Sequence, residues 1–378
     1  MAQSPYWEKV CYSSIAILSI RLLKGNCHLM KNMTARPRSD SELFLAVTRA
    51  AKRLNESVNW QEGITQFLEE LGVNTGSSRV WMFKLIEKGD DYYITEYLHE
   101  WAARPELSNI DDLQLHHQRV EIKDQDVKDL YEARLRGEWR QHHRANLSGH
   151  LLQEFIRQDI HSMLTIPIMV NNQWWGILGF DDCDGPKSYP ESYVAALEIA
   201  SVLLTNAILR ARLHWEANHD YLTALFNRRY LIKLIEEDLQ QQKSGQFTIL
   251  DIDFFKKVND EHGHQAGDAA LVHLANILKA HLPSHALLAR FGGEEFALWQ
   301  PDSAEQPSVE VDKLRKALVD TPFIWKGAPV TLTASFGCAY ASHALHEKLD
   351  DFETLFARAD SALMKAKLKG RNRVIIAE

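Results

Sequence analysis

The chain has 378 residues, a length that suits two domains with connecting segments better than a single core. Hydrophobic residues make up 45% and charged residues 25%, which excludes a largely disordered chain. The net charge of -8 offers no basic surface for a nucleic-acid polymer, although a single nucleotide needs only a local positive site. The four cysteines form no CxxC pair, which is typical of reduced thiols in a cytoplasmic protein.

Residues 1–38 differ from the sequence that follows, and we expect a poorly ordered extension there. The apolar run from Val10 to Ile20 is too short to span a bilayer. No small-residue cleavage pattern follows it, so a signal peptide is the weaker interpretation and we expect a cytoplasmic chain with no membrane span. Met30 and Met33 are alternative starts.

The first domain is expected over residues 39–191. Helical spacing of apolar residues predicts a helix from Ser39 or Asp40 through Leu54, and a second over 61–71 that stops at Gly72. The elements that follow are strands over 79–86 and 92–98, a polar stretch of loop and surface helix over 111–144, and strands over 162–170 and 174–181 that form a hairpin.

A long helical pattern then runs to about Glu216, and residues 192–217 are predicted to form a linker helix. Its apolar residues repeat at spacings of three and four, as in a coiled-coil seam with one polar member: Val194, Leu197, Ser201, Leu204, Ile208, Ala211 and Trp215. The first half of this seam is equally consistent with packing on its own domain. The second half has no domain left to pack on, so a seam between two copies is favoured there.

The second domain is expected over residues 218–378, and its mixed order of strands and helices predicts an α+β fold. The expected elements are strand 247–252, helix 270–280, strands 286–290 and 296–299 around a Gly-Gly turn, strand 330–341, and helix 352–369.

Acidic residues stand at two points of this domain. Asp251 and Asp253 end an apolar strand, and alternation points both to the same face. Paired acids of this kind hold divalent cations, because hard oxygen ligands suit magnesium. Glu294 and Glu295 follow the Gly-Gly pair, where they could complete a metal site with Asp251. Taken singly, the strand-end acids are equally consistent with a surface acidic turn, and the Gly-Gly pair alone would indicate only an ordinary hairpin.

Two further motifs could bind a nucleotide. Asn259 and Asp268 offer the donor and acceptor needed to read a guanine edge, although such residues are also ordinary in polar loops. Lys367 and Arg371 are four residues apart at a helix end, where they could hold phosphates. Cations are favoured at helix C-termini in any case.

Together these motifs resemble the GGDEF family of diguanylate cyclases over residues 220–373. The resemblance rests on Asp220-Tyr221-Leu222-Thr223 with Asn227-Arg228-Arg229, the strand-end acids, Asn259-Asp260 to Gly267-Asp268, Gly292-Gly293-Glu294-Glu295-Phe296, Ser335-Phe336-Gly337, and Ala359-Asp360 to Asn372. It implies a palm-like antiparallel sheet flanked by helices. It also implies an enzyme that condenses two GTP molecules into cyclic di-GMP and releases two pyrophosphates. The alternatives are a catalytically silent module that binds GTP or cyclic di-GMP, and another nucleotidyl cyclase or palm-like polymerase.

The resemblance also assigns roles by position. Metal ligands for Mg2+, or for Mn2+, would be Asp251, the Ile252 carbonyl and Glu294, with Asp253 as a candidate ligand of a second ion. The catalytic set would be Glu294, Glu295, Asp251 and Lys256. Substrate contacts would be Asn259 and Asp268 on guanine, Phe255 against the base, His264 nearby, and Lys256, Lys367 and Arg371 on phosphates. Each domain would hold one GTP, so activity would need a homodimer.

Several positions depart from the family pattern. Ala224 and Phe226 replace the usual Gly and Pro of the entry motif, a structural change that we expect to be tolerated. Met364 replaces the usual Tyr of the last helix, which we interpret as a change in packing. The RxxD motif of product inhibition would fall at Pro283 to Ala286, which carries neither charge.

Residues 162–183 resemble a GAF sensor domain, and the match covers about 41–209. This implies that the first domain binds a small-molecule ligand or dimerises, and that it regulates the cyclase. Six tryptophans could line a pocket, although core packing is favoured: Trp60, Trp81, Trp101, Trp139, Trp174 and Trp175. Four histidines are expected at the surface rather than on haem or metal: His116, His117, His142 and His143.

Overall fold

The computed structural model describes residues 40–57, 60–301, 308–341 and 351–377. The chain divides into two compact units, with the boundary between Leu213 and His214. The predicted extension, with Cys11 and Cys27, lies outside the described residues. Cys183 and Cys338, one in each unit, are buried free thiols.

The first unit contains an antiparallel sheet, whose six described strands have the order β3-β2-β1-β6-β5-β4. Its strands are β1 (Arg79–Lys88), β2 (Tyr92–Ala102), β3 (Gln118–Glu121), β4 (Arg140–His143), β5 (Ser162–Val170) and β6 (Gln173–Asp182). Its helices are α2 (Asp40–Glu56), α3 (Trp60–Thr75), α4 (Gln125–Arg136), α5 (Gly149–Arg157) and α6 (Glu191–Asn218), with 3-10 turns at Pro105–Leu107, Leu113–Leu115 and Arg144–Asn146.

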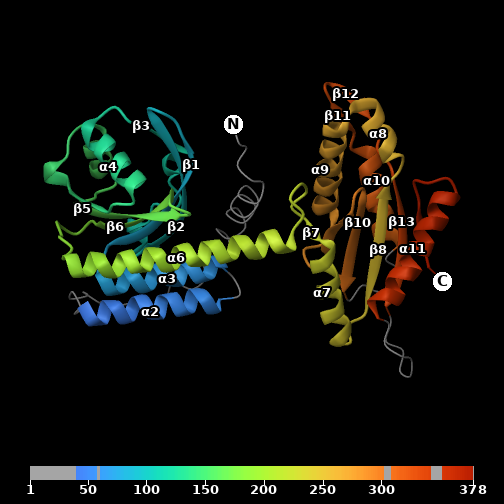
Figure 1. Cartoon of the computed structure of the whole chain (residues 1–378), viewed down its shortest axis with the longest axis horizontal. Coiled ribbons are helices and arrows are strands. Elements are labelled where there is room, and N and C mark those ends of the chain that lie inside the picture. The colour runs from blue at the N-terminus through green and yellow to red at the C-terminus, as the bar shows by residue number, and fades with distance from the viewer. Residues whose placement is uncertain (1–39, 58–59, 302–307, 342–350, 378) are drawn as a thin grey trace. The chain divides into compact units, whose positions relative to one another are not determined.

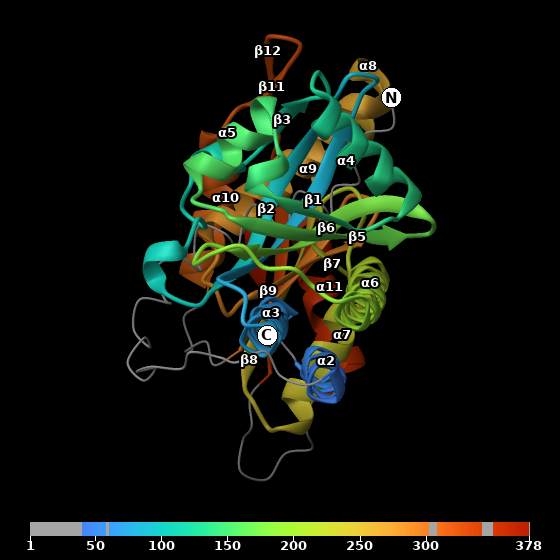
Figure 2. The ribbon, with the colours of Figure 1, turned by 90° about the vertical axis from the view of Figure 1, so that its left-hand side faces the viewer.

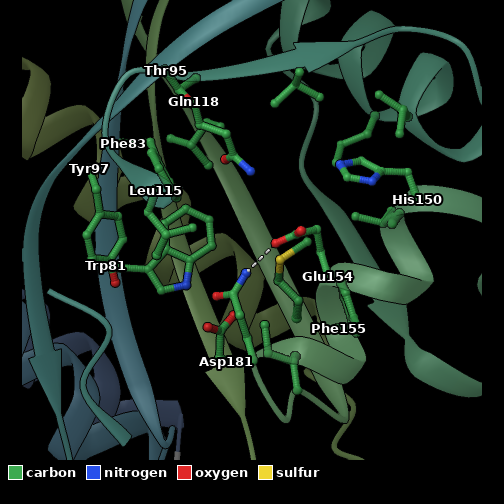
Figure 3. Close-up of a pocket in the computed structure, with 18 of the residues that line it drawn as sticks. Trp81, Phe83, Thr95, Tyr97, Leu115, Gln118, His150, Glu154, Phe155 and Asp181 are labelled. Carbon is green, nitrogen blue, oxygen red and sulfur yellow. Dashed lines mark hydrogen bonds between the residues drawn. The ribbon is translucent and has the colours of Figure 1, made fainter. Parts of the chain in front are cut away.

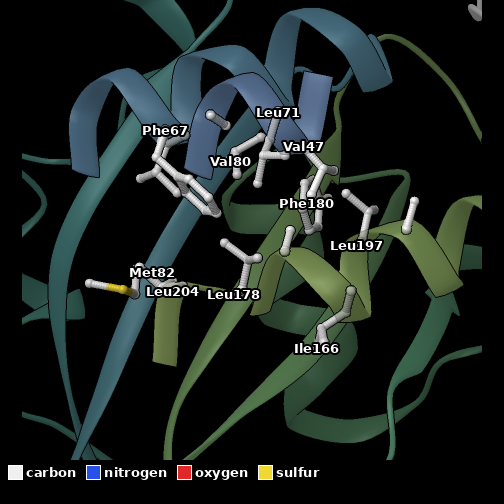
Figure 4. Packing of buried hydrophobic residues seen from close by; sticks show 14 of the residues in the cluster. Val47, Phe67, Leu71, Val80, Met82, Ile166, Leu178, Phe180, Leu197 and Leu204 are labelled. Atoms are coloured by element: carbon white, nitrogen blue, oxygen red, sulfur yellow. The ribbon is translucent and has the colours of Figure 1, made fainter. Parts of the chain in front are cut away.

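The two faces of this sheet carry two separate cores. Alternation along β1 sends Val80 and Met82 to one face, where α2, α3 and α6 pack. Figure 2 looks along these three helices, which gather on that side of the sheet, and Figure 4 shows Phe67 and Leu197 packing in their core. Trp81 points to the opposite face, where α4 and α5 cover a second, aromatic cluster.

The first part of the predicted coiled-coil seam packs inside its own unit. Val194, Leu197, Leu204 and Ile208 are at most 3% exposed and belong to the same core as α2 and α3. Ser201 is buried as well, and its hydroxyl donates to the Pro167 carbonyl at 2.9 Å. α6 is long and apolar enough to cross a membrane by length and composition, but half of its most apolar window is buried, as in a core helix.

Two other predictions for this unit were wrong. Helix α3 does not stop at Gly72 but continues to Thr75, and the residue after it, Gly76, has a φ of 66°. Gly72 is needed instead for packing, because a Cβ there would lie 2.1 Å from the Trp101 ring. The polar stretch 111–144 also contains strands β3 and β4, which the sequence analysis took for loop.

The second unit contains a sheet whose six described strands have the order β14-β13-β8-β10-β9-β7. Its strands are β7 (Phe226–Asn227), β8 (Gly245–Ile252), β9 (Leu287–Gly292), β10 (Glu295–Pro301), β13 (Ala334–Ala341) and β14 (Val374–Ile376), with a separate hairpin of β11 (Phe323–Trp325) and β12 (Ala328–Val330). Its helices are α7 (Arg228–Gln240), α8 (Phe255–His262), α9 (His264–His281), α10 (Ser308–Asp320) and α11 (Phe352–Leu368).

The four inner strands of this sheet pair antiparallel, and the edge strands β7 and β14 pair parallel. Helices flank both faces (Figure 1). Leu250 and Ile252 face the core shared with α9 and α10, while Phe247 and Ile249 face the core shared with α7 and α11. The predicted α+β architecture with an antiparallel palm-like sheet is therefore confirmed. The predicted strand 330–341 is interrupted after Val330.

Candidate active site

Strand β8 lies between β13 and β10, and its end carries the first predicted acid. Asp251 follows Phe247 and Ile249 in the alternation, so it lies on the face covered by α11. Its register partners are Glu295 on β10 and Ser335 on β13. Asp251 is only 7% exposed, so its charge has to be balanced within the protein.

Lys367 on α11 supplies that balance, with Nζ 2.9 Å from Asp251 Oδ2. Burial raises the pKa of Asp251, and Lys367 opposes this shift. Burial also raises the pKa of Glu294, with a further rise from Asp251 and then an opposing effect of Lys367. The charge of Arg371 also lowers the pKa of Asp251, and the charge of Glu295 also raises the pKa of Glu294. The structure therefore brings together five of the predicted site residues.

The acids fit a divalent cation. Two neighbouring carboxylates with raised pKa values share one lysine, so a further positive charge would be stabilised there. The Ile252 N–H donates to the Glu294 carbonyl at 3.4 Å, so the backbones of two predicted ligands lie side by side. The donors are hard oxygens, which suit Mg2+ or Mn2+. Within the described ranges no three His, Cys, Asp or Glu side chains form a metal cluster.

Asp253 has a different environment from Asp251. Its Oδ1 accepts a hydrogen bond from Ser335 Oγ at 2.7 Å. Its Oδ2 accepts from Thr333 Oγ1 at 2.8 Å and from the Asn372 N–H at 3.0 Å. The carboxylate therefore anchors the segment after α11 against the end of β8. Its part in a second metal site stays a prediction.

The predicted turn is centred one residue later than expected, on Gly293 and Glu294, so Glu294 itself is at the hairpin tip. Arg290 fixes this turn, because its Nη2 and Nε donate to the Gly293 carbonyl at 2.8 and 3.1 Å. Its Nη1 pairs with Asp220 at 3.2 Å, and Asp220 also accepts from the Thr223 N–H at 2.8 Å. Sequence analysis gave Arg290 no role, although it stands two residues before the glycine pair.

The departures from the family pattern have visible consequences. Ala224, in the usual glycine position, has a φ of 53°, a left-handed conformation that costs a non-glycine residue about 1–2 kcal/mol. Phe226, in the usual proline position, packs between the rings of His219 and Tyr230, at 5.0 and 5.1 Å. Met364 is 56% exposed, so the interpretation as a change in packing was wrong.

The predicted guanine readers lie on α8 and α9. A Cβ at Gly267 would stand 2.0 Å from Asn259 Oδ1 and 3.1 Å from the Phe255 ring, so only glycine allows this approach. Asp268 is the next residue and is exposed. The side chains of Asn259 and Asp268 form no hydrogen bond with any residue that the structure describes, and their part in reading a base stays a prediction. Phe255 is 7% exposed and belongs mostly to the core.

The remaining predicted contacts are less closely joined to the acids. Arg371 stacks over the exposed Phe254 ring, with Cζ 4.5 Å from the ring centroid. Phe254 has a φ of 57° and precedes α8, whose first turn carries the exposed Lys256. His264 is exposed at the start of α9. Within the described part of the chain, no hydrogen bond or ion pair joins Lys256 or His264 to Asp251 and Glu294.

The chain was compared with families and proteins of known sequence or structure. Residues 217–373 match the family "Diguanylate cyclase, GGDEF domain", and residues 59–208 match the GAF domain family. The probable diguanylate cyclase DgcF of Escherichia coli K12 is 32% identical over 201 residues, or 50% of this chain and 64% of that protein. The diguanylate cyclase DgcP of Pseudomonas aeruginosa is 38% identical over 163 residues, or 42% of this chain and 24% of that protein.

The chain thus spans less than two thirds of the length of each of these relatives. Among solved structures, the coiled coil and GGDEF domain of DgcB from Caulobacter crescentus, in complex with c-di-GMP, is 27% identical, with a TM-score of 0.41. That match covers 48% of this chain and 100% of the other. From the two family matches, the chain carries a GGDEF domain over residues 217–373, with a GAF domain over residues 59–208 ahead of it.

Proposed function

We propose that the chain is a diguanylate cyclase that condenses two GTP molecules into cyclic di-GMP and releases two pyrophosphates. The observation that carries this proposal is the cluster of the buried Asp251 with the half-buried Glu294 and Lys367 at the end of β8. Relatives named as diguanylate cyclases support it. A catalytically silent module is disfavoured, because such a module has no need to keep two acids with raised pKa values side by side.

In this proposal the protein binds each GTP at three places. Asn259 and Asp268 hold the guanine edge, while Lys367, Arg371 and Lys256 hold phosphate oxygens. Asp251, Glu294 and the Ile252 carbonyl would hold Mg2+, or Mn2+, which supplies charge neutralisation at the phosphates and a lower pKa for the attacking 3′-hydroxyl. Lys367, which pairs with Asp251 in this structure, would hold phosphate oxygens once the metal balances the charge of Asp251. Glu295, beside these acids, is positioned to accept the hydroxyl proton.

The reaction joins two nucleotides, so two copies of the chain must bring their GTP molecules together. We therefore propose a homodimer as the active form. On α6 the exposed apolar residues Ile199, Val202 and Leu213 fit a helical seam, since 199 and 213 are two heptads apart. The later seam residues Ala211 and Trp215 stay a prediction. We propose further that the GAF domain senses a small molecule and controls turnover, and that the chain works in the cytoplasm, where GTP is made.

The test is incubation of the purified chain with GTP and MgCl2, followed by chromatography of the products. The proposal predicts cyclic di-GMP and two pyrophosphates for each molecule formed, with none when Mg2+ is chelated. GTP binding without any product would instead establish the silent module. Equal conversion of ATP into a cyclic dinucleotide would point to a different nucleotidyl cyclase.

A further inference from the structure

The GAF domain contains a cavity of about 100 Å3 between its sheet and helices α4 and α5. Figure 3 shows Trp81, Phe83, Tyr97 and Phe155 around it. These side chains and Tyr93 contribute five aromatic rings to the wall, beside several Leu, Val, Ile and Met side chains. The space corresponds to roughly eight water molecules, so the cavity suits only a small ligand. A tetrapyrrole or a cyclic nucleotide is far larger than this cavity.

One cavity-lining side chain lacks the partner that its charge requires. Arg134 on α4 is 6% exposed. Its Nη1 donates to the Tyr93 hydroxyl at 2.8 Å, and its Cζ lies 5.6–5.7 Å from the ring centroids of Tyr93 and Trp174. Its Nε, however, has no hydrogen-bond partner among the residues that the structure describes. In the same described ranges, no carboxylate lies within ion-pair distance of its guanidinium.

Both carboxylates that line the cavity pair with arginines other than Arg134, although Asp181 Oδ1 has no hydrogen-bond partner among the described residues. Asp181 Oδ2 is 2.9 Å from Arg79 Nη2 in a fully buried pair. Glu154 Oε2 is 2.7 Å from Arg157 Nη2. The charge of Arg134 therefore stays unbalanced in a buried aromatic environment. A buried charge without a counter-ion is strongly unfavourable, and a buried guanidinium pairs best with a carboxylate.

We propose that this cavity binds a small aromatic monocarboxylate, with its carboxylate on Arg134 and its ring against the aromatic wall. Benzoate, with about nine non-hydrogen atoms, is the smallest ligand that offers both an aromatic ring and a carboxylate. The positive charge selects a monoanion, and the five aromatic side chains offer faces and edges on which a flat ring can pack. The binding step stands apart from the cyclase reaction, whereas any effect of the ligand on turnover rests on the proposed function.

The experiment is isothermal titration calorimetry of the full chain with benzoate, benzamide and acetate, without nucleotide. Benzoate should bind at least tenfold more tightly than benzamide, which has the same shape without the charge, and than acetate, which lacks the ring. Arg134→Gln should weaken benzoate binding at least tenfold, and Arg134→Lys should weaken it less. Arg136→Gln is the matched control: this arginine is on the same helix but half-exposed and paired with Glu138, so binding should not change.

Three results would overturn the inference: equal affinity for benzoate and benzamide, unchanged benzoate binding by a folded Arg134→Gln variant, or no benzoate binding at millimolar concentration. The comparison of benzoate with benzamide uses the native chain, so it stands even if the variants do not fold. Calorimetry needs no GTP. A chain that makes cyclic di-GMP but ignores benzoate would therefore refute this inference alone, and one that binds benzoate but makes no product would refute only the proposed function.

Discussion

The ion pair between Asp220 and Arg290 connects the entry of the GGDEF domain to the turn that carries Glu294. Asp220→Asn preserves the shape of the side chain and its hydrogen bond from Thr223, but removes the charge facing Arg290. Arg290 then keeps only its hydrogen bonds to the Gly293 carbonyl. Its Nη1 loses the opposite charge in a site where the side chains of residues 290 and 220 are each 15% exposed. We expect the turn, and with it Glu294, to be held less firmly.

The size of the effect follows from the geometry. At the 3.2 Å separation, opposite charges attract by about 5 kcal/mol with an effective dielectric constant of ~20. Desolvation of two largely buried groups offsets most of this attraction, which leaves about 1–3 kcal/mol. A loss of about 1.4 kcal/mol in the positioning of Glu294 corresponds to a tenfold fall in turnover. We therefore expect Asp220→Asn to lower kcat about tenfold and the free energy of unfolding by about 1–2 kcal/mol.

The assay combines initial rates of cyclic di-GMP formation at saturating GTP with urea unfolding. Asp238→Asn is the matched control. Asp238 is on α7, away from the acids; it is 16% exposed and pairs with Lys243 at 2.8 Å. It should lower stability but leave kcat nearly unchanged. Because Arg290→Gln breaks the same pair, combining it with Asp220→Asn should give less than the sum of the two effects. Equal kcat values for Asp220→Asn and Asp238→Asn would show that the Asp220–Arg290 pair does not hold Glu294 in position.

Three further predictions concern other parts of the chain. Burial raises the pKa of Asp182 from 3.8 to about 6, so its stabilising contribution is complete below pH 4 and is lost as the pH rises through 6. Urea unfolding followed by the GAF tryptophans should show a loss of about 1 kcal/mol from pH 5 to pH 7 that Asp182→Asn largely removes. The turn at Pro283 to Ala286 carries no charged pair, so added cyclic di-GMP should barely slow the initial rate. Strong inhibition abolished by changing Ser284 and His285 to Ala would contradict this expectation. Asp268→Asn should narrow the preference for GTP over ATP at least tenfold in competition assays, and an unchanged preference would remove Asp268 as a base reader.

Parts of the fold could be predicted where the sequence pattern and the tertiary structure agree. The first strand of the hairpin at residues 162–182 has the predicted bounds, because both strands are apolar and Asn171 and Asn172 accept the positive φ values of a tight turn. Gly72 shows the opposite case, since the close approach of Trp101, rather than a helix end, requires that glycine. The short strands β3 and β4 are polar and owe their place to backbone pairing, which leaves no apolar alternation to read.

The candidate site, too, could be predicted from the sequence only in part. Asp251 could be placed because the strand before it is apolar and ends at the acid. Its contact with Lys367 could not, because 116 residues separate the two and only the packing of α11 on the sheet brings them together. Likewise, the seam on α6 could not be assigned from spacing alone, because both faces of this helix carry apolar residues.

In the proposed function, Asp251 and Glu294 are the acids of a GTP-condensing site. This assignment is tested by the rate at which purified Glu294→Gln and Asp251→Asn variants form cyclic di-GMP from GTP and Mg2+, measured beside the native chain. Both changes keep the shape of the side chain and remove one charge, so turnover should fall at least ~100-fold while the circular dichroism spectrum stays native. Near-normal cyclic di-GMP synthesis by either folded variant would contradict the assignment.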